Sequence, residues 1–169
     1  MLCCTSRQGW QGRLQLFGDK ADLPADFSGK WQCHEIEGEF GDVLEALGVP
    51  QMARLRMAAR NYGIGKESVG IVMKSKDEMH ITSQIPEMQG GGTRVTKHRL
   101  DGVEHEFEMP NGSTASASIH WEGAELHGVI AAHGNKYHLV RFMRDGQMCS
   151  RMTAGPDNKV QATRIYKKI

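Results

Sequence analysis

Turn signals recur about every ten residues over the part of the chain that follows residue 66. Each combines Gly, Asn, Asp, Ser or Pro, the residues that best suit the backbone angles of a tight turn. The signals are Ser75-Lys76-Asp77, Gly90-Gly91-Gly92, Asp101-Gly102, Asn111-Gly112, Glu122-Gly123, Gly134-Asn135, Asp145-Gly146 and Gly155-Pro156-Asp157-Asn158. The short stretches between them, such as VGIVMK, HEFEM and YHLVRFM, are β-branched or alternate in polarity. Tight turns join antiparallel strands, so the sequence predicts an all-β chain whose strands run up and down in order.

A further strand precedes this region, in the stretch FSGKWQCHEI at residues 27–36. Trp31, Cys33 and Glu35 stand at a period of two in it. Side chains two residues apart point to the same face of a strand, so we expect these three to share one face.

Two short helices are predicted between this first strand and the remaining strands. The first carries an apolar stripe at helical spacing, formed by Phe40, Val43, Leu44 and Leu47, and Gly48 can end it. Pro50 then suits the first turn of a second helix in PQMARLRMAAR (50–60), where a missing N–H costs nothing. Helices this short are unstable alone, so we expect both to lie on the sheet.

The pattern as a whole indicates one barrel. With the strand at 27–36, the chain has about ten antiparallel strands joined in sequence, with the helix pair inserted after the first. Such a barrel can enclose a ligand. Residues 1–26 lack periodicity and are interpreted as a flexible N-terminal extension, whereas residues 27–169 form the barrel domain.

The charge balance argues against nucleic acid as a partner. Lys and Arg number 21 and Asp and Glu number 20, which leaves a formal net charge of +1. Without a net positive field there is no general attraction to phosphate backbones. Aromatic residues make up 7% of the chain and are scattered, so no stacking platform for single-stranded nucleic acid is indicated.

The four cysteines are Cys3, Cys4, Cys33 and Cys149, and none has C-x-x-C spacing. We interpret them as reduced thiols. No apolar run suits a signal peptide or a membrane span, so a cytoplasmic location is expected. The Cys3-Cys4 pair could accept palmitate, but Leu2 stands where N-myristoylation requires glycine, and an unmodified tail is the preferred reading.

Three segments carry a resemblance to a known family. DFSGKW, the ALGV between the two helices and the closing ATRIYKK occur in this order, and together the sequence from Asp26 to Ile169 resembles the intracellular fatty-acid-binding and cellular retinoid-binding proteins. The resemblance implies a ten-stranded up-and-down barrel of the calycin type with a two-helix lid. It also implies a monomeric, non-enzymatic carrier without a cofactor.

The family's head-group residues fall on three positions of this sequence. The resemblance assigns ligand carboxylate binding to Arg141 in YHLVRFMRDG and to Arg164 and Tyr166 in TRIY. Strand alternation supports this independently, because Arg164 and Tyr166 are two residues apart and so point the same way. Tyr137, Leu139 and Met143 share the parity of Arg141 and are expected to line the pocket, as is Met52 from the second helix.

A buried arginine stays charged and is costly without a partner, so these residues predict an acid as the ligand. A carboxylate supplies the missing charge and accepts paired hydrogen bonds. A long-chain fatty acid is the main hypothesis. The IHWEG segment and the Met- and Ala-rich second helix leave retinoic acid as an alternative, while retinol carriers of the family tend to have glutamine at the two arginine positions.

Two other interpretations stay open. The arginines could pair with wall carboxylates instead of a ligand, and the barrel could be a scaffold that binds another protein through its loops or its tail. Arg54, Arg56 and Arg60 lie on or near the second helix and either form an ordinary solvated face or contact anionic membranes transiently during ligand delivery.

No metal or catalytic site is indicated. The eight histidines form no H-E-x-x-H and pair with no cysteine at ligand spacing, and no nucleophile elbow or phosphate loop is present. We therefore predict that the chain is not an enzyme. The links at 61–68, 86–92 and 154–159 exceed the family's usual length, and strand parity places all three at the helix-covered end.

Overall fold

The computed structural model describes residues 22–85, 91–109 and 111–169 of the chain. Its elements follow in the order β1 (Gly29–Gly38), α1 (Phe40–Ala46), α2 (Gln51–Ala59), η2 (Asn61–Gly63), β2 (Ser68–Ser75), β3 (Glu78–Gln84), β4 (Thr93–Arg99), β5 (His105–Glu108), β6 (Thr114–Glu122), β7 (Glu125–Ala132), β8 (Asn135–Arg144), β9 (Gln147–Ala154), η4 (Pro156–Asn158) and β10 (Val160–Lys168).

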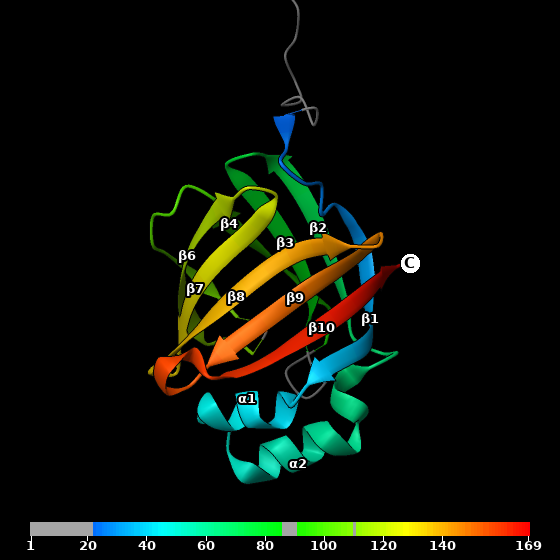
Figure 1. Cartoon of the computed structure of the whole chain (residues 1–169), viewed down its shortest axis with the longest axis vertical. Helices are drawn as coiled ribbons and strands as arrows, with labels where there is room; N and C mark the ends of the chain where they lie inside the picture. Colours follow the sequence, from blue (N-terminus) through cyan, green and yellow to red (C-terminus); the bar gives the residue numbers. More distant parts are fainter. Residues whose placement is uncertain (1–21, 86–90, 110) are drawn as a thin grey trace, which may run out of the picture.

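The strands form one antiparallel sheet that closes almost completely into a barrel (Figure 1). Apart from β4 and β5, consecutive strands pair with one another, and β1 also pairs with β10. The order ends at β4 and β5, which no ladder joins within the described residues. The predicted ten-stranded, up-and-down barrel with helices between the first two strands is confirmed.

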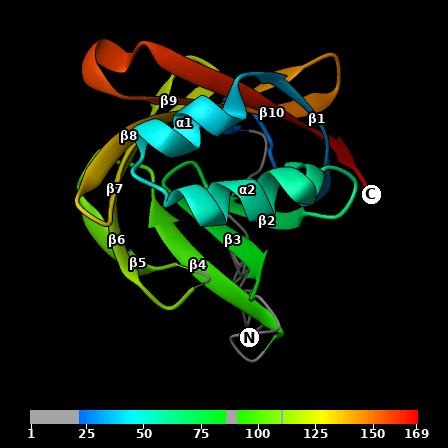
Figure 2. The same cartoon turned by 90° about the horizontal axis from the view of Figure 1, so that it is seen from below.

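The helices lie across one end of the barrel, as Figure 2 shows. α1 packs through Phe40, Val43 and Leu44 against Ala154 and Ala162 of β9 and β10. Gly48 adopts a φ of +72° just beyond α1, as expected of a residue that ends a helix. No residue of α2 is buried, so this second helix covers the barrel more loosely.

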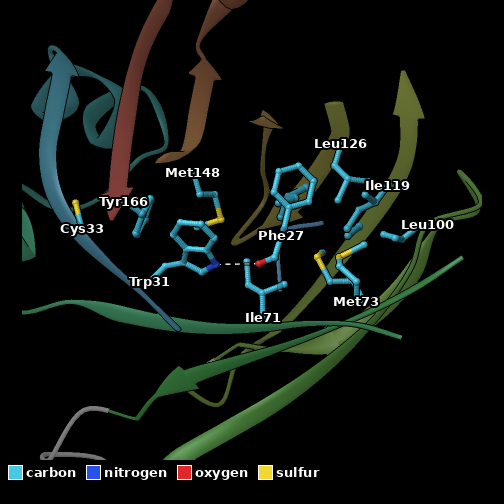
Figure 3. Close-up of a cluster of buried hydrophobic side chains, with 13 residues drawn as sticks. Phe27, Trp31, Cys33, Ile71, Met73, Leu100, Ile119, Leu126, Met148 and Tyr166 are labelled. Carbon is cyan, nitrogen blue, oxygen red and sulfur yellow. Dashed lines mark hydrogen bonds between the residues drawn. The ribbon is translucent and has the colours of Figure 1, made fainter. Parts of the chain in front are cut away.

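The opposite end of the barrel is filled by apolar side chains (Figure 3). Phe27 is fully buried and stacks on Trp121 with ring centroids 5.9 Å apart, and Trp31 Nε1 donates to the carbonyl of Phe27 at 2.8 Å. Leu23 and Ala25 pack against the same cluster. The packed region therefore begins before Phe27, inside the segment interpreted from sequence as an extension, and residues 1–21 lie outside the described residues.

One prediction for β1 is wrong. Trp31 and Cys33 are buried together as expected, but Glu35 is exposed. The register with β10 shifts between Cys33 and Glu35 and then pairs Ile36 with Arg164. A bulge inserts an extra residue and so reverses the alternation of faces beyond it.

Cys33 and Cys149 are free, buried thiols, whereas Cys3 and Cys4 lie outside the described residues. Within the described part of the chain, neither helix has the length and apolarity needed to cross a bilayer.

Candidate ligand-binding site

The two arginines singled out from sequence lie in one row across three neighbouring strands. Arg141 of β8 pairs in register with Ser150 of β9, and Ser150 pairs with Arg164 of β10. Ser150 and Arg164 are buried, and residues paired across antiparallel strands point to the same face. Ser150 therefore lies in the row between the two arginines, Arg141 on one side and Arg164 on the other.

A cavity of about 380 Å³ lies beside this row. Its lining combines two phenols, a guanidinium, a carboxylate, small polar groups and apolar side chains: Glu67, Ser68, Val69, Ile81, Ser83, Gln84, Tyr137, Arg141, Met148, Ser150 and Tyr166. Apolar walls with a few convergent polar groups are typical of small-molecule sites.

Arg141 has no acidic partner among the described residues. Its Nη1 group lies 3.5 Å from Met79 Sδ on β3, and its Nε is buried without a hydrogen-bond partner. Burial lowers the pKa of Arg141, and the nearby Tyr166 and Tyr137 partly oppose this effect. Arginine nevertheless stays charged in proteins, so an uncompensated cation faces the cavity.

Arg164, in contrast, has an acidic partner, although its Nε, like that of Arg141, is buried without a hydrogen-bond partner. Its Nη1 forms an ion pair with Glu67 Oε1 at 2.6 Å, and its Nη2 donates to the carbonyl of Tyr62 at 2.8 Å. Its guanidinium carbon lies 4.5 Å from the ring centroid of Phe40. Burial acts to lower the pKa of Arg164, but the charge and hydrogen bond of Glu67 raise it above its ordinary value. Pairing with a wall carboxylate, the alternative left open from sequence, is thus observed for Arg164 and not for Arg141.

The two phenols remain protonated hydrogen-bond donors. Burial raises the pKa of Tyr137, with the charge of Arg141 acting against it. Burial also raises the pKa of Tyr166, against the charge of Arg164. Both hydroxyls can therefore donate to a bound anion without losing a proton.

Among the residues that line the cavity, Glu67 is the charged one that the sequence does not predict. It comes from the link between α2 and β2, and 97 positions separate it from Arg164 in the sequence. The link carries two unusual conformations, because Asn61 and Tyr62 have φ angles of +51° and +50°. No local pattern reports a contact of this kind, because it depends on how the lid meets the last strand.

A second, outer pocket of about 510 Å³ adjoins the cavity. Met57, Arg60, Tyr62, Gly63, Lys66 and Ile85 line it, together with Glu67 and Gln84, which also line the inner cavity. Glu67 therefore stands at the boundary between the interior and a pocket below α2.

The other predicted lining residues divide into two groups. Tyr137 lines the cavity, and Leu139 packs against the apolar cluster beside it. Met52 and Met143 do not line it in this structure, and they are 63% and 36% exposed. Met52 lies in the first turn of α2, whose inward methionine is Met57. Met143 is near the end of β8 that lies away from α1, since Asn135 at its start donates to the carbonyl of Leu47.

The basic residues of the second helix also differ from one another. Arg54 forms an ion pair with Glu45, whereas Arg56 and Arg60 are exposed near Met52 and Leu55, whose side chains are also exposed. The helix and its end thus present two cations without an acidic partner in the described part of the chain, together with two exposed apolar side chains.

Two of the long links border the lid, as expected. The link at 61–68 lines part of the outer pocket. In the link at 154–159, a Cβ built on Gly155 would lie 3.5 Å from the Cβ of Ala46 in α1. Most of the link at 86–92 lies outside the described residues. Among the residues that the structure describes, no three His, Cys, Asp or Glu side chains are arranged to hold a metal ion.

Several solved structures share this architecture. A Schistosoma mansoni fatty-acid-binding protein in complex with arachidonic acid superposes with a TM-score of 0.65 at 20% sequence identity, over 85% of this chain and 96% of that one. The chain has the fold of the fatty-acid-binding proteins. A fatty-acid-binding protein from brain tissue of Drosophila melanogaster shares this fold with a TM-score of 0.59 at 22% identity, over 84% and 99% of the two chains. The wild-type fluorescent protein UnaG matches with a TM-score of 0.62 at 22% identity, over 85% and 97%.

No family model matches the sequence, and no curated protein does. The fold that the sequence resemblance implied, that of the fatty-acid-binding proteins, is nevertheless confirmed.

Proposed function

We propose that this protein binds one long-chain carboxylate, a fatty acid, inside its barrel. The observation that carries the proposal is Arg141, a guanidinium that lines the cavity and has no acidic partner among the described residues. A buried charge without a counter-ion is costly, and a ligand carboxylate would supply that counter-ion.

In the proposed complex, Arg141 and the hydroxyl of Tyr166 hold the carboxylate, and Tyr137 offers a second hydroxyl. All three line the cavity. Arg164, which the sequence resemblance also assigned to the head group, acts on it through its charge beside Tyr166 while its Nη groups remain on Glu67 and Tyr62.

The hydrocarbon tail would supply most of the affinity. Burying about sixteen methylenes at roughly 0.8 kcal/mol each gives a gross gain on the order of 12 kcal/mol, before ordering and association costs. The arginine then mainly orients the ligand and selects acids over alcohols. The fold supports a hydrophobic ligand, and the match to a complex with arachidonic acid supports a fatty acid as the first ligand to test.

We further propose that the protein is a cytoplasmic monomer that contacts anionic membranes transiently through α2. Arg56 and Arg60 beside the exposed Met52 and Leu55 support this, because cations and apolar side chains on one helix suit a membrane surface.

Titration of oleate and oleyl alcohol into wild type and Arg141→Gln tests the proposal. We expect the variant to weaken oleate binding by about ten- to a hundredfold and to leave the alcohol nearly unchanged, because only the acid needs the guanidinium. Arg144→Gln is the matched control, since Arg144 lies on the same strand and pairs with Glu37 outside the cavity. Equal losses for acid and alcohol, or no saturable binding by wild type, would overturn the proposal. Competition between oleate and all-trans retinoic acid then ranks the two acids.

A further inference from the structure

The lid region supplies the ion-pair, carbonyl and aromatic partners of the Arg164 guanidinium, and Tyr166 on the same strand is a further hydrogen-bond partner. Glu67 and Tyr62 belong to the link between α2 and β2, and Phe40 begins α1. Arg164 is thus held by the lid and its connection to β2, whereas Arg141 in the same strand row has no such partner among the described residues.

The backbone around Glu67 is shaped to place its carboxylate. Gly63 has a φ of +84°, and a Cβ built there would stand 2.7 Å from Glu67 Oε2. The amide of Glu67 donates to the carbonyl of Gly63 at 2.7 Å, and its carbonyl accepts from the amide of Cys33 at 3.0 Å. A side chain at Gly63 would require the Glu67 carboxylate to shift.

This arrangement fixes the charge that the site offers to a ligand. Among the residues that the structure describes, two guanidinium groups and one carboxylate lie in or beside the cavity, which leaves one positive charge. Arg60 and Lys66 border the outer pocket but are exposed to water, where their fields are screened. Glu67 itself is about half exposed at the boundary of the two pockets, so a ligand reaching the cavity passes beside it.

We propose that Glu67 is a specificity-determining residue that restricts the ligand's head group to a single negative charge. It neutralises Arg164, competes with the ligand for that guanidinium and leaves Arg141 as the cation available to an acid. This inference rests on the proposed function, because it concerns how the same cavity selects among lipids.

Glu67→Gln tests the proposal, because glutamine keeps the shape of the side chain and removes its charge. Wild type and the variant are titrated at about pH 8 with hexadecanoate, hexadecyl phosphate and hexadecanol, the phosphate monoester carrying about two charges at that pH. We expect the variant to bind hexadecanoate several-fold more tightly and hexadecyl phosphate more than tenfold more tightly, with hexadecanol unchanged.

Two further variants separate charge from structure. Glu67→Gln combined with Arg164→Gln restores one positive charge and should return the preference between hexadecyl phosphate and hexadecanoate toward that of wild type. Glu37→Gln removes the carboxylate of an ion pair with Arg144 outside the cavity and should change neither affinity. Thermal unfolding of each variant verifies that the barrel remains folded.

The outcomes are distinct. If wild type fails to bind hexadecanoate, the proposed function falls and this inference with it. If wild type binds hexadecanoate and Glu67→Gln shows the same preference between the two anions, only the specificity role of Glu67 is overturned.

Discussion

His98 on β4 and His105 on β5 approach each other to 3.2 Å, from Nδ1 to Nε2, across the two barrel edges that no ladder joins in the described residues. The other ring nitrogen of His98 lies 3.2 Å from Thr96 Oγ1, and its ring packs against Phe107 with centroids 4.7 Å apart. Burial lowers the pKa of His98 to about 4, and the charges of His105, Arg141 and His80 act in the same direction. His98 is therefore a neutral link between the two edges at physiological pH.

This histidine should make the barrel less stable in mild acid. Above pH 6.5 His98 is neutral in both the folded and the unfolded chain, so it adds no pH dependence. Between pH 6.5 and about 4 the unfolded chain takes up the proton and the folded chain does not, so stability falls with falling pH. Below about 4 both states are protonated and the loss levels off at about 3 kcal/mol.

Urea unfolding at about pH 7.5 and about pH 5 measures this loss. His98→Gln should reduce the difference between the two free energies of unfolding, whereas His138→Gln, on the exposed side of β8, should keep it. An unchanged difference in His98→Gln would show that other groups cause the acid sensitivity.

Substitution of Gly63 should imitate the loss of the Glu67 carboxylate. In Gly63→Ala the new Cβ would lie 2.7 Å from Glu67 Oε2, so we expect the preference for hexadecyl phosphate over hexadecanoate to shift in the same direction as in Glu67→Gln. The φ of +84° also makes alanine unfavourable there, by about 1 kcal/mol.

Gly65→Ala is the matched control for that substitution. Gly65 has a similar φ of +74°, but no atom lies within 4 Å of a Cβ added there. It should lose about the same stability, measured by urea unfolding, and keep the wild-type ligand preference. A shift of preference in both variants would mean that backbone strain, and not the carboxylate, changes the site.

Phe27→Ala should strongly destabilise the end of the barrel opposite the helices. Phe27 is fully buried and stacked on Trp121, and replacing a buried phenylalanine by alanine costs about 3–5 kcal/mol. Val95→Ala, at a side chain that is 56% exposed, should stay within about 0.5 kcal/mol of wild type. Free energies of unfolding from urea titration decide the comparison, and a loss below about 1 kcal/mol for Phe27→Ala would contradict the packing described.

Neutralising Arg56 and Arg60 together should weaken binding to vesicles that contain phosphatidylserine. Each exposed cation near an anionic surface contributes about 1 kcal/mol, so we expect a loss of about tenfold or more by co-sedimentation. Arg54→Gln should have a smaller effect, because the charge of Arg54 is paired with Glu45. Two outcomes would argue against a membrane face on α2. One is that Arg54→Gln weakens vesicle binding as much as the change at Arg56 and Arg60, and the other is that none of these changes alters binding to anionic vesicles.

The strands and the lid could be predicted because each depends on local signals. Turn residues such as Asp145 and Gly146 mark where β8 ends and β9 begins. The apolar stripe that begins at Phe40 specifies α1. The shared face of Ser150, Arg141 and Arg164 follows from strand alternation once the register is known.

The rest depends on three-dimensional packing. Glu67 reaches Arg164 only because the α2–β2 link folds under the lid, and nothing near Glu67 in the sequence reports that contact. Glu35 was assigned to the wrong face because a bulge does not appear in a period-two pattern. Met52 is exposed in this structure, and because α2 buries no residue, its sequence does not specify which side faces the barrel.

The attachment of Arg164 to Glu67 and Tyr62 also links two events that occur at different places on the molecule. A ligand carboxylate that attracts the Arg164 guanidinium would weaken its bonds to Glu67 and Tyr62 in the segment below α2. A membrane surface that moved this segment would in turn change the electrostatic environment of Tyr166. Thermodynamic linkage makes such an effect reciprocal: whatever factor a membrane imposes on ligand affinity, the ligand imposes on membrane affinity. Ligand binding and membrane binding would then share one coupling free energy, which could be measured from either side.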